Sequence, residues 1–138
     1  MLHVSSRDLA AALARRLDDV APTRITVRAD DSNLAVLHDG QVLGISGAPA
    51  ILETAEALHE PAENLETAVR AALSAVQDYI AEATTEPWPG TGGRQPNPDA
   101  RVEANTVLMW FGPEGDPVLS LPPIDLATGI TAPRAPGP

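Results

Sequence analysis

The chain contains no cysteine among its 138 residues. Disulfide bonds, zinc sites built from thiolates and cysteine nucleophiles are therefore all excluded. A chain of this length forms one domain and buries about two thirds of the surface that it exposes when unfolded. A core of that size is stable without a metal ion or a covalent cross-link, so the missing cysteines place no limit on folding.

Basic residues are few and lysine is absent: nine arginines stand against 19 acidic residues, which gives a net charge of −10. A surface this anionic repels nucleic acids and acidic membranes at long range, so we expect neither as a partner. The same charge attracts cations and basic proteins. A protein partner or a basic peptide segment is therefore the partner class that the composition predicts.

Long hydrophobic runs are also missing. The apolar run of residues 9–14 is short, follows Asp8 and is followed by Arg15 and Arg16. These flanks are not those of a signal peptide, and no run approaches the roughly 18 apolar residues needed to span a membrane. We therefore expect a soluble, cytoplasmic protein.

Two stretches do show the periodicity of amphipathic helices. Apolar residues recur every three or four positions over residues 63–83, which predicts a long helix that lies across a sheet. A first helix is expected to begin after Ser5 as the N-cap and to end before Pro22. The segment 48–84 also contains Pro61, and the sequence leaves open whether this segment is one kinked helix or two.

Strand signals fall in two regions. Residues 23–29, 34–38 and 41–46 form the first region, where Asp39-Gly40 is a strong signal for a type I′ hairpin turn. This region predicts a three-stranded antiparallel meander.

The second strand region differs from the first. Residues 102–111 are apolar on both faces, which indicates a strand that is covered on both sides. Residues 117–121 are expected to return beside it as an edge strand, where prolines are tolerated. No internal repeat of useful length is found.

These elements predict an α+β fold with the order α-β-β-β-α-α-β-β. We expect one antiparallel sheet of about five strands, with the helices packed on one face. The domain is expected to span residues 1–121, with a Pro/Gly-rich internal loop over residues 85–100. Residues 122–138 are expected to form a C-terminal extension whose last residues are disordered.

Residue combinations that carry chemistry are rare. Glu56 and His59 have the one-turn spacing of a di-iron carboxylate motif, but such a site needs a second copy and two further glutamates. Residues 44–47 lack the spacing of a nucleophile elbow. We therefore expect no enzyme, no cofactor, and neither a catalytic nor a metal site.

The first group of candidate partner-binding residues is cationic. Arg24 and Arg28 are expected to share the outer face of the first strand, with Thr26 between them. In an acidic protein, such a row of cationic side chains could form a binding surface for a partner that carries carboxylates. A solvated sheet surface with ordinary ion pairs is the alternative.

The second group of candidates is apolar and lies on the strand around Trp110. Aromatic residues and methionine are enriched at protein interfaces, so this cluster is expected either to form core or to contact a partner. Both interpretations remain open at this point. The cluster comprises Val107, Met109, Trp110 and Phe111.

The predicted element order, with the small size and the acidic balance, resembles the type III secretion chaperone-like fold group. That resemblance implies a protein, usually dimeric, that holds extended segments of partner proteins. Separately, residues 76–82 (VQDYIAE) with the following EPWP motif at 86–89 resemble small uncharacterised actinobacterial proteins. The second resemblance implies no chemistry.

The leading functional hypothesis is a non-enzymatic protein-binding module of chaperone or adaptor type, which we expect to form a homodimer. It would use the Trp110 strand and an open sheet face. One alternative is a small-ligand or metal-binding protein that uses the region of Glu56 and His59. Another is a structural component of a larger, phage-like assembly.

Overall fold

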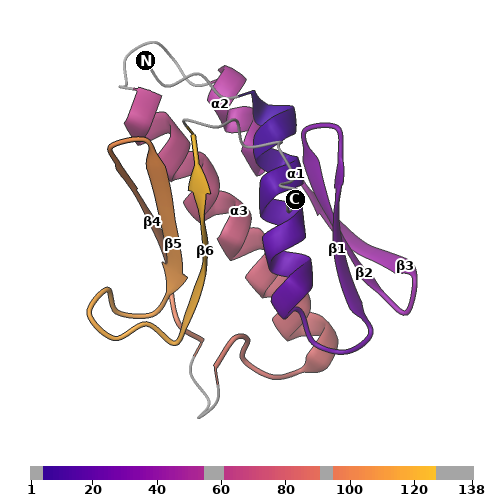
Figure 1. Ribbon diagram of the computed structural model, residues 1–138. Coiled ribbons are helices and arrows are strands. Elements are labelled where there is room, and N and C mark those ends of the chain that lie inside the picture. Colours follow the sequence, from indigo (N-terminus) through magenta and orange to yellow (C-terminus); the bar gives the residue numbers. More distant parts are fainter. Residues whose placement is uncertain (1–4, 55–60, 91–94, 127–138) are drawn as a thin grey trace, which may run out of the picture.

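The computed structural model describes residues 5–54, 61–90 and 95–126. In this part of the chain two long helices pack with two small antiparallel sheets (Figure 1). The elements, in chain order, are α1 (Ser6–Val20), β1 (Ile25–Asp30), β2 (Asn33–His38), β3 (Gln41–Ser46), the 3-10 turn η1 (Ala48–Ala50), α2 (Ile51–Thr54), α3 (Pro61–Thr84), β4 (Pro98–Glu103), β5 (Thr106–Phe111) and β6 (Leu119–Asp125).

The strands form two separate three-stranded sheets, in the orders β1-β2-β3 and β4-β5-β6. We call them sheet A and sheet B. The α+β class is confirmed, but the prediction of one sheet of about five strands is wrong. The physical reason is that β5 pairs with β4 and β6, the strands that precede and follow it in the sequence. It therefore needs no partner from the first meander.

The strand predicted over residues 102–111 is in fact two strands. A tight turn at Ala104 and Asn105 divides them, and β4 extends back to Pro98, into the segment expected to be loop. Ala104 has a φ of 55°, a left-handed conformation that alanine rarely adopts. Because alanine is not a typical turn residue, the sequence does not mark a turn at position 104. The sequence pattern therefore predicts one continuous strand where the chain forms a hairpin.

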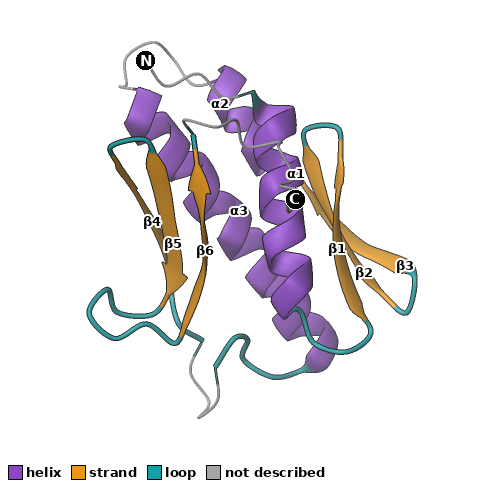
Figure 2. Cartoon of the chain, in the orientation of Figure 1, coloured by secondary structure: helices purple, strands orange, loops and turns teal. Residues whose placement is uncertain are grey.

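The helices lie between the sheets, so each sheet has one face toward the helices and one face outward (Figure 1 and Figure 2). α1 packs against β1, and α3 packs against β4. Each helix also contacts the third strand of the other sheet: α1 contacts β6, and α3 contacts β3. The two sheets therefore share one hydrophobic core instead of enclosing separate ones.

The order of one helix followed by three antiparallel strands thus occurs twice. We call α1 to β3 the first half and α3 to β6 the second half. The first hairpin of each half has the same geometry, because Asp31 and Ala104 occupy the same turn position with φ values of 57° and 55°. This repetition of structure has no counterpart in a detectable sequence repeat.

The predicted helices are confirmed, and their apolar stripes form the centre of the core. Ser5 caps α1 through its side-chain oxygen, which accepts a hydrogen bond from the Asp8 amide at 3.0 Å. Burial of each large aliphatic side chain stabilises the fold by about 1.5–3 kcal/mol. The fully buried stripe residues include Leu9, Leu13 and Leu17 on α1 and Val69, Leu73, Val76 and Ile80 on α3.

In the segment 48–84 the described residues form η1, α2 and α3, and α2 packs against α3. The segment begins with η1 and α2, and α3 begins at Pro61, where the missing proline N–H has no helical partner to lose. Residues 55–60 lie outside the described residues, so the connection between α2 and α3 is not part of this description.

Arg16 joins the first half to the last strand. Its Nε and Nη2 atoms donate hydrogen bonds to the carbonyl oxygens of Pro122 and Pro123, at 2.8 and 2.9 Å. These two prolines oppose the single residue Leu108 on β5, so they form a bulge in β6. Burial, together with the nearby charge of Arg15, lowers the pKa of the Arg16 guanidinium below its usual value.

Candidate functional site

The two arginines predicted to form a cationic stripe do not lie in one row. Arg24 precedes β1 in a turn, with a φ of 78°, and its guanidinium lies 3.7 Å from the carboxylate of Asp39. Arg28 lies within β1 on the exposed outer face of sheet A, opposite Ala35. The structure therefore separates a paired arginine at the hairpin end from a solvated arginine on the sheet.

The apolar residues around Trp110 divide between the two faces of sheet B. Val107, Met109 and Phe111 face the helices and are 0–2% exposed within the core. Trp110 points to the outer face and is nevertheless only 7% exposed. The first three side chains contact the interior of their own chain, so they present no surface to a partner.

Trp110 is covered on the outer face by a charged network. The guanidinium carbon of Arg101 lies 5.9 Å from the centre of the indole, within the range of a cation–π contact. Arg101 also forms ion pairs with Glu103, at 2.9 Å, and with Glu114 from the loop between β5 and β6. The inner face of β5 is thus buried in the core, whereas its outer face is only partly covered and borders a pocket of about 370 Å³ beside Trp110.

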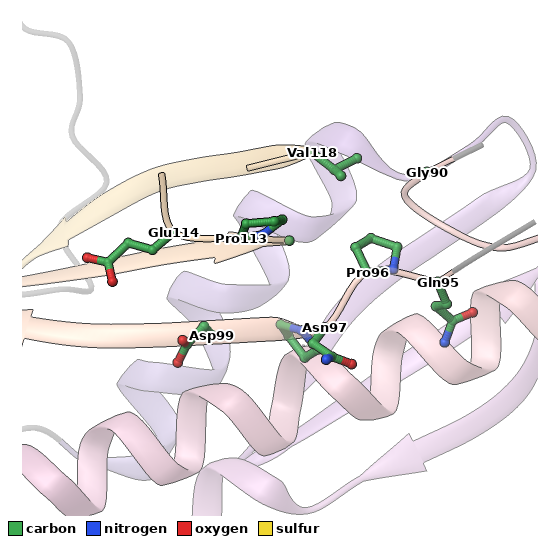
Figure 3. A pocket seen from close by; sticks show the side chains of 10 residues that line it. Gly90, Gln95, Pro96, Asn97, Asp99, Pro113, Glu114 and Val118 are labelled. Atoms are coloured by element: carbon green, nitrogen blue, oxygen red, sulfur yellow. The ribbon is translucent and has the colours of Figure 1, made fainter. Parts of the chain in front are cut away.

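A pocket lies at the end of sheet B beside the start of β4 (Figure 3). Its volume is about 670 Å³. Two carboxylates line it, and both have cationic partners: Asp99 lies 3.6 Å from Arg70, and Glu114 pairs with Arg101. The residues that line the pocket are Gly90, Gln95, Pro96, Asn97, Pro98, Asp99, Gly112, Pro113, Glu114 and Val118.

The described residues that line this pocket supply no argument for a catalytic role. Among the described residues, its lining contains no imidazole, hydroxyl or thiol, which are the usual nucleophiles and bases of hydrolytic sites. The described part of the lining therefore offers shape without one of these groups.

The most exposed apolar surface on a strand lies on β3, the edge strand of sheet A. Val42, Leu43 and Ile45 are 54%, 39% and 53% exposed. Exposed aliphatic side chains that cluster on one strand are unusual, whereas single ones are normal. This strand is therefore the strongest candidate for a contact surface.

A β-bulge explains why so many side chains of β3 are exposed. Val42 lies opposite Leu37, Gly44 lies opposite Val36, and Leu43 is the extra residue between them. Val36 faces the core, and Leu37 faces the outer side of the sheet, outside the core cluster. Val42 therefore shares the outer face with Leu37, and the bulge redirects the next side chain, Leu43, toward solvent as well.

The edge of β3 also differs from the other sheet edges in its chemistry. Charged residues and prolines on an edge strand discourage pairing with another chain. The run from Gly40 to Leu52 contains no charged residue, and β3 itself contains no proline. By contrast, the other edges carry Arg28 and Asp30 on β1, Pro98, Asp99, Arg101 and Glu103 on β4, and Pro122, Pro123 and Asp125 on β6.

α3 packs against the inner face of β3 through Tyr79. The Tyr79 ring lies directly under Gly44, where any side chain would collide with it. The Tyr79 hydroxyl donates a weak hydrogen bond to the carbonyl oxygen of Ile45 at 3.4 Å. The strand thus presents its free edge and its apolar side chains from a fixed position.

Sequence reasoning did not select β3 as a site. The signal was present, because an uncharged run of apolar residues in a chain of net charge −10 is conspicuous. The local pattern predicts only the last strand of a meander there, whereas the aromatic residues of β5 match the composition of protein interfaces more closely. The bulge that exposes Leu43 has no sequence signature.

Glu56 and His59, the alternative ligand site, lie outside the described residues. Within residues 5–54, 61–90 and 95–126 there is no group of three or more histidine, aspartate or glutamate side chains that could hold a metal ion. Among the same residues, no helix combines the length and apolar character needed to cross a membrane.

Comparisons with protein-family models, with curated proteins and with solved structures find no match to this chain. The likeness in element order to the type III secretion chaperone-like group therefore stays a prediction, as does the likeness to actinobacterial proteins. Any proposal for the function therefore rests on the structure of this chain alone.

Proposed function

We propose that this chain is a non-enzymatic protein-binding module that binds an extended segment of a partner along the edge of β3. The observation that supports this function is the combination of an uncharged edge strand with three exposed aliphatic side chains. The Trp110 strand, favoured by the sequence, has no part in it, because its apolar side chains are covered within the chain.

Strand addition suits the physical properties of this edge. The outward backbone N–H and C=O groups of an edge strand supply affinity to any extended peptide, and alternate side chains supply specificity. Val42 and Ile45 would make the side-chain contacts on the outer face of sheet A. Gly44 leaves room on the inner face for the Tyr79 ring, which supports the strand from the side of α3.

The experiment is a selection from a library of random linear peptides. The chain is immobilised at low surface density so that separate copies do not meet. We expect the wild-type chain to enrich peptides with apolar residues at alternate positions. An Ile45→Lys variant should lose at least tenfold in affinity for them, because the lysine places a charge in the apolar contact.

Val118→Lys is the matched control, because Val118 is 53% exposed, like Ile45, but lies in the loop that leads into β6. It should bind the selected peptides as the wild type does. Hydrogen exchange adds a direct readout, since a bound strand should slow exchange of the β3 amides that face away from β2. Failure to enrich any peptide, or equal binding by Ile45→Lys, would contradict the proposal.

A further inference from the structure

The edge of β3 has a sequence that can pair with itself. Antiparallel pairing about a two-fold axis between residues 43 and 44 places Val42 opposite the partner's Ile45. Both of these residues lie on the outer face of sheet A, since Val42 opposes Leu37 and Ile45 opposes Ala35. Two pairs of β-branched residues would therefore form, one on each side of the axis.

The remaining positions of this register are also compatible. Leu43 meets the partner's Gly44, which has no side chain to oppose the bulged residue. At each end Gln41 meets the partner's Ser46, an uncharged polar pair that can form hydrogen bonds. A shift by one residue would place outward side chains opposite inward ones, so the register is well determined.

We propose, building on the proposed function, that the partner of β3 is a second copy of this chain, and that two copies join their sheets A into one six-stranded antiparallel sheet. The contact is isologous, because the same residues serve on both copies. Residues 40–52 carry no charge, so no like charges meet at the axis despite the net charge of −10 on each chain.

The effect of salt on binding distinguishes a second copy of this chain from a basic peptide as the partner of β3. Two acidic chains repel at a distance, and salt screens that repulsion. Self-pairing should therefore strengthen as the salt concentration rises from about 50 to 500 mM. Binding of a basic peptide to an acidic chain should weaken over the same range.

The test is sedimentation equilibrium of the full chain over a range of concentrations. We expect the wild type to approach twice its monomer mass of 14.4 kDa. Leu43→Lys and Leu43→Glu should each raise the dissociation constant at least tenfold, because the two copies of residue 43 lie close to the axis and repel. An equimolar mixture of the two variants should regain the dimer, because the opposite charges attract.

Val118→Lys and Val118→Glu are the controls and should leave the dimer unchanged. Circular dichroism of each Leu43 variant checks that the fold is kept, as expected for an exposed position. A wild-type monomer up to about 1 mM would overturn self-pairing, and so would a dimer that survives in Leu43→Lys or is not regained in the mixture. The peptide selection on isolated copies would still decide the proposed function by itself.

Discussion

Sheet A and sheet B share one backbone plan but present opposite outer surfaces. Each follows a helix, begins with a tight two-residue hairpin and contains a register shift. On sheet B the large outward side chain, Trp110, is covered by Arg101 and its two glutamate partners. On sheet A the outward aliphatic side chains of β3 have no such cover within the described residues.

This difference shows that edge chemistry, and not topology, decides which half leaves apolar side chains exposed on its outer surface. The bulge in β6 is closed by Arg16, which binds the carbonyl oxygens of its two prolines. The bulge in β3 instead turns Leu43 toward solvent. A β-bulge thus occurs in both halves. In β6 its carbonyl oxygens are bound by Arg16, and in β3 it leaves a leucine exposed.

The largest expected effect tests whether the halves share one core. Phe111 is fully buried on sheet B. Its ring packs edge-to-face with the Trp88 ring, and the two ring centroids lie 5.4 Å apart. Phe111→Ala should lower the free energy of unfolding by about 3–5 kcal/mol, because it leaves a cavity. Phe111→Leu, the matched control, should cost less, about 1.5 kcal/mol or below.

Urea denaturation, followed by both circular dichroism and tryptophan fluorescence, measures these changes. A shared core predicts that the two probes give the same midpoint in the wild type and in both variants. Separate transitions would show that the halves unfold independently, which would contradict the description of one core.

An intermediate effect concerns the support of β3. Gly44→Ala places a Cβ against the Tyr79 ring and should destabilise the fold by about 1–3 kcal/mol, since the overlap must be relieved by movement. Gly47→Ala is the control, because its Cβ would lie 3.4 Å from the nearest side-chain atom, Oδ1 of Asn33. Both are measured by thermal or urea unfolding.

A double-mutant cycle makes this assignment specific. In a Tyr79→Leu background the cost of Gly44→Ala should fall, because the ring that causes the collision is gone. Equal costs in the two backgrounds would mean that Tyr79 does not fix the position of β3.

The smallest expected effect tests the cover on sheet B. Arg101→Ala removes the cation above Trp110 and should cost about 0.5–1 kcal/mol, as for a partly exposed cation–π contact. The sharper readout is acrylamide quenching of Trp110 in a Trp88→Phe background, which should increase. Arg28→Ala, on the outer face of sheet A, should leave the quenching unchanged.

Much of the first half was predictable because its local signals agree with its tertiary structure. The periodicity of α1, its Ser5 cap and the Asp39-Gly40 turn all indicated the observed elements. Asp39 and Gly40 have φ values of 53° and 83°, which confirms the left-handed turn. Here turn chemistry and hydrophobic pattern pointed to the same meander.

The second half was less predictable because its strands contain residues that usually end strands. β4 begins with Pro98 and Asp99, and β6 contains Pro122 and Pro123. Prolines are compatible with these positions because both strands are sheet edges and β6 is bulged there. Pairing with β5, hydrogen bonds between β4 and side chains of α3, and the donation by Arg16 hold these segments as strands, and none of these contacts is visible in local sequence.

The candidate site shows the same limit. An apolar strand such as β5 is equally consistent with core and interface until its neighbours are known. Arg101 and Glu114, which cover its outer face, lie on different segments of the chain. For β3 the reverse holds, since its sequence has an ordinary strand pattern, and only its position at an edge and its bulge expose its apolar side chains.

The hydrogen bonds from Arg16 have a consequence for how the protein is made. Their acceptors lie 106 and 107 residues further along the chain. During synthesis α1 therefore leaves the ribosome long before the strand that satisfies its guanidinium exists. Because contacts between such distant residues form slowly, the contact between α1 and β6 is among the last that the chain can complete.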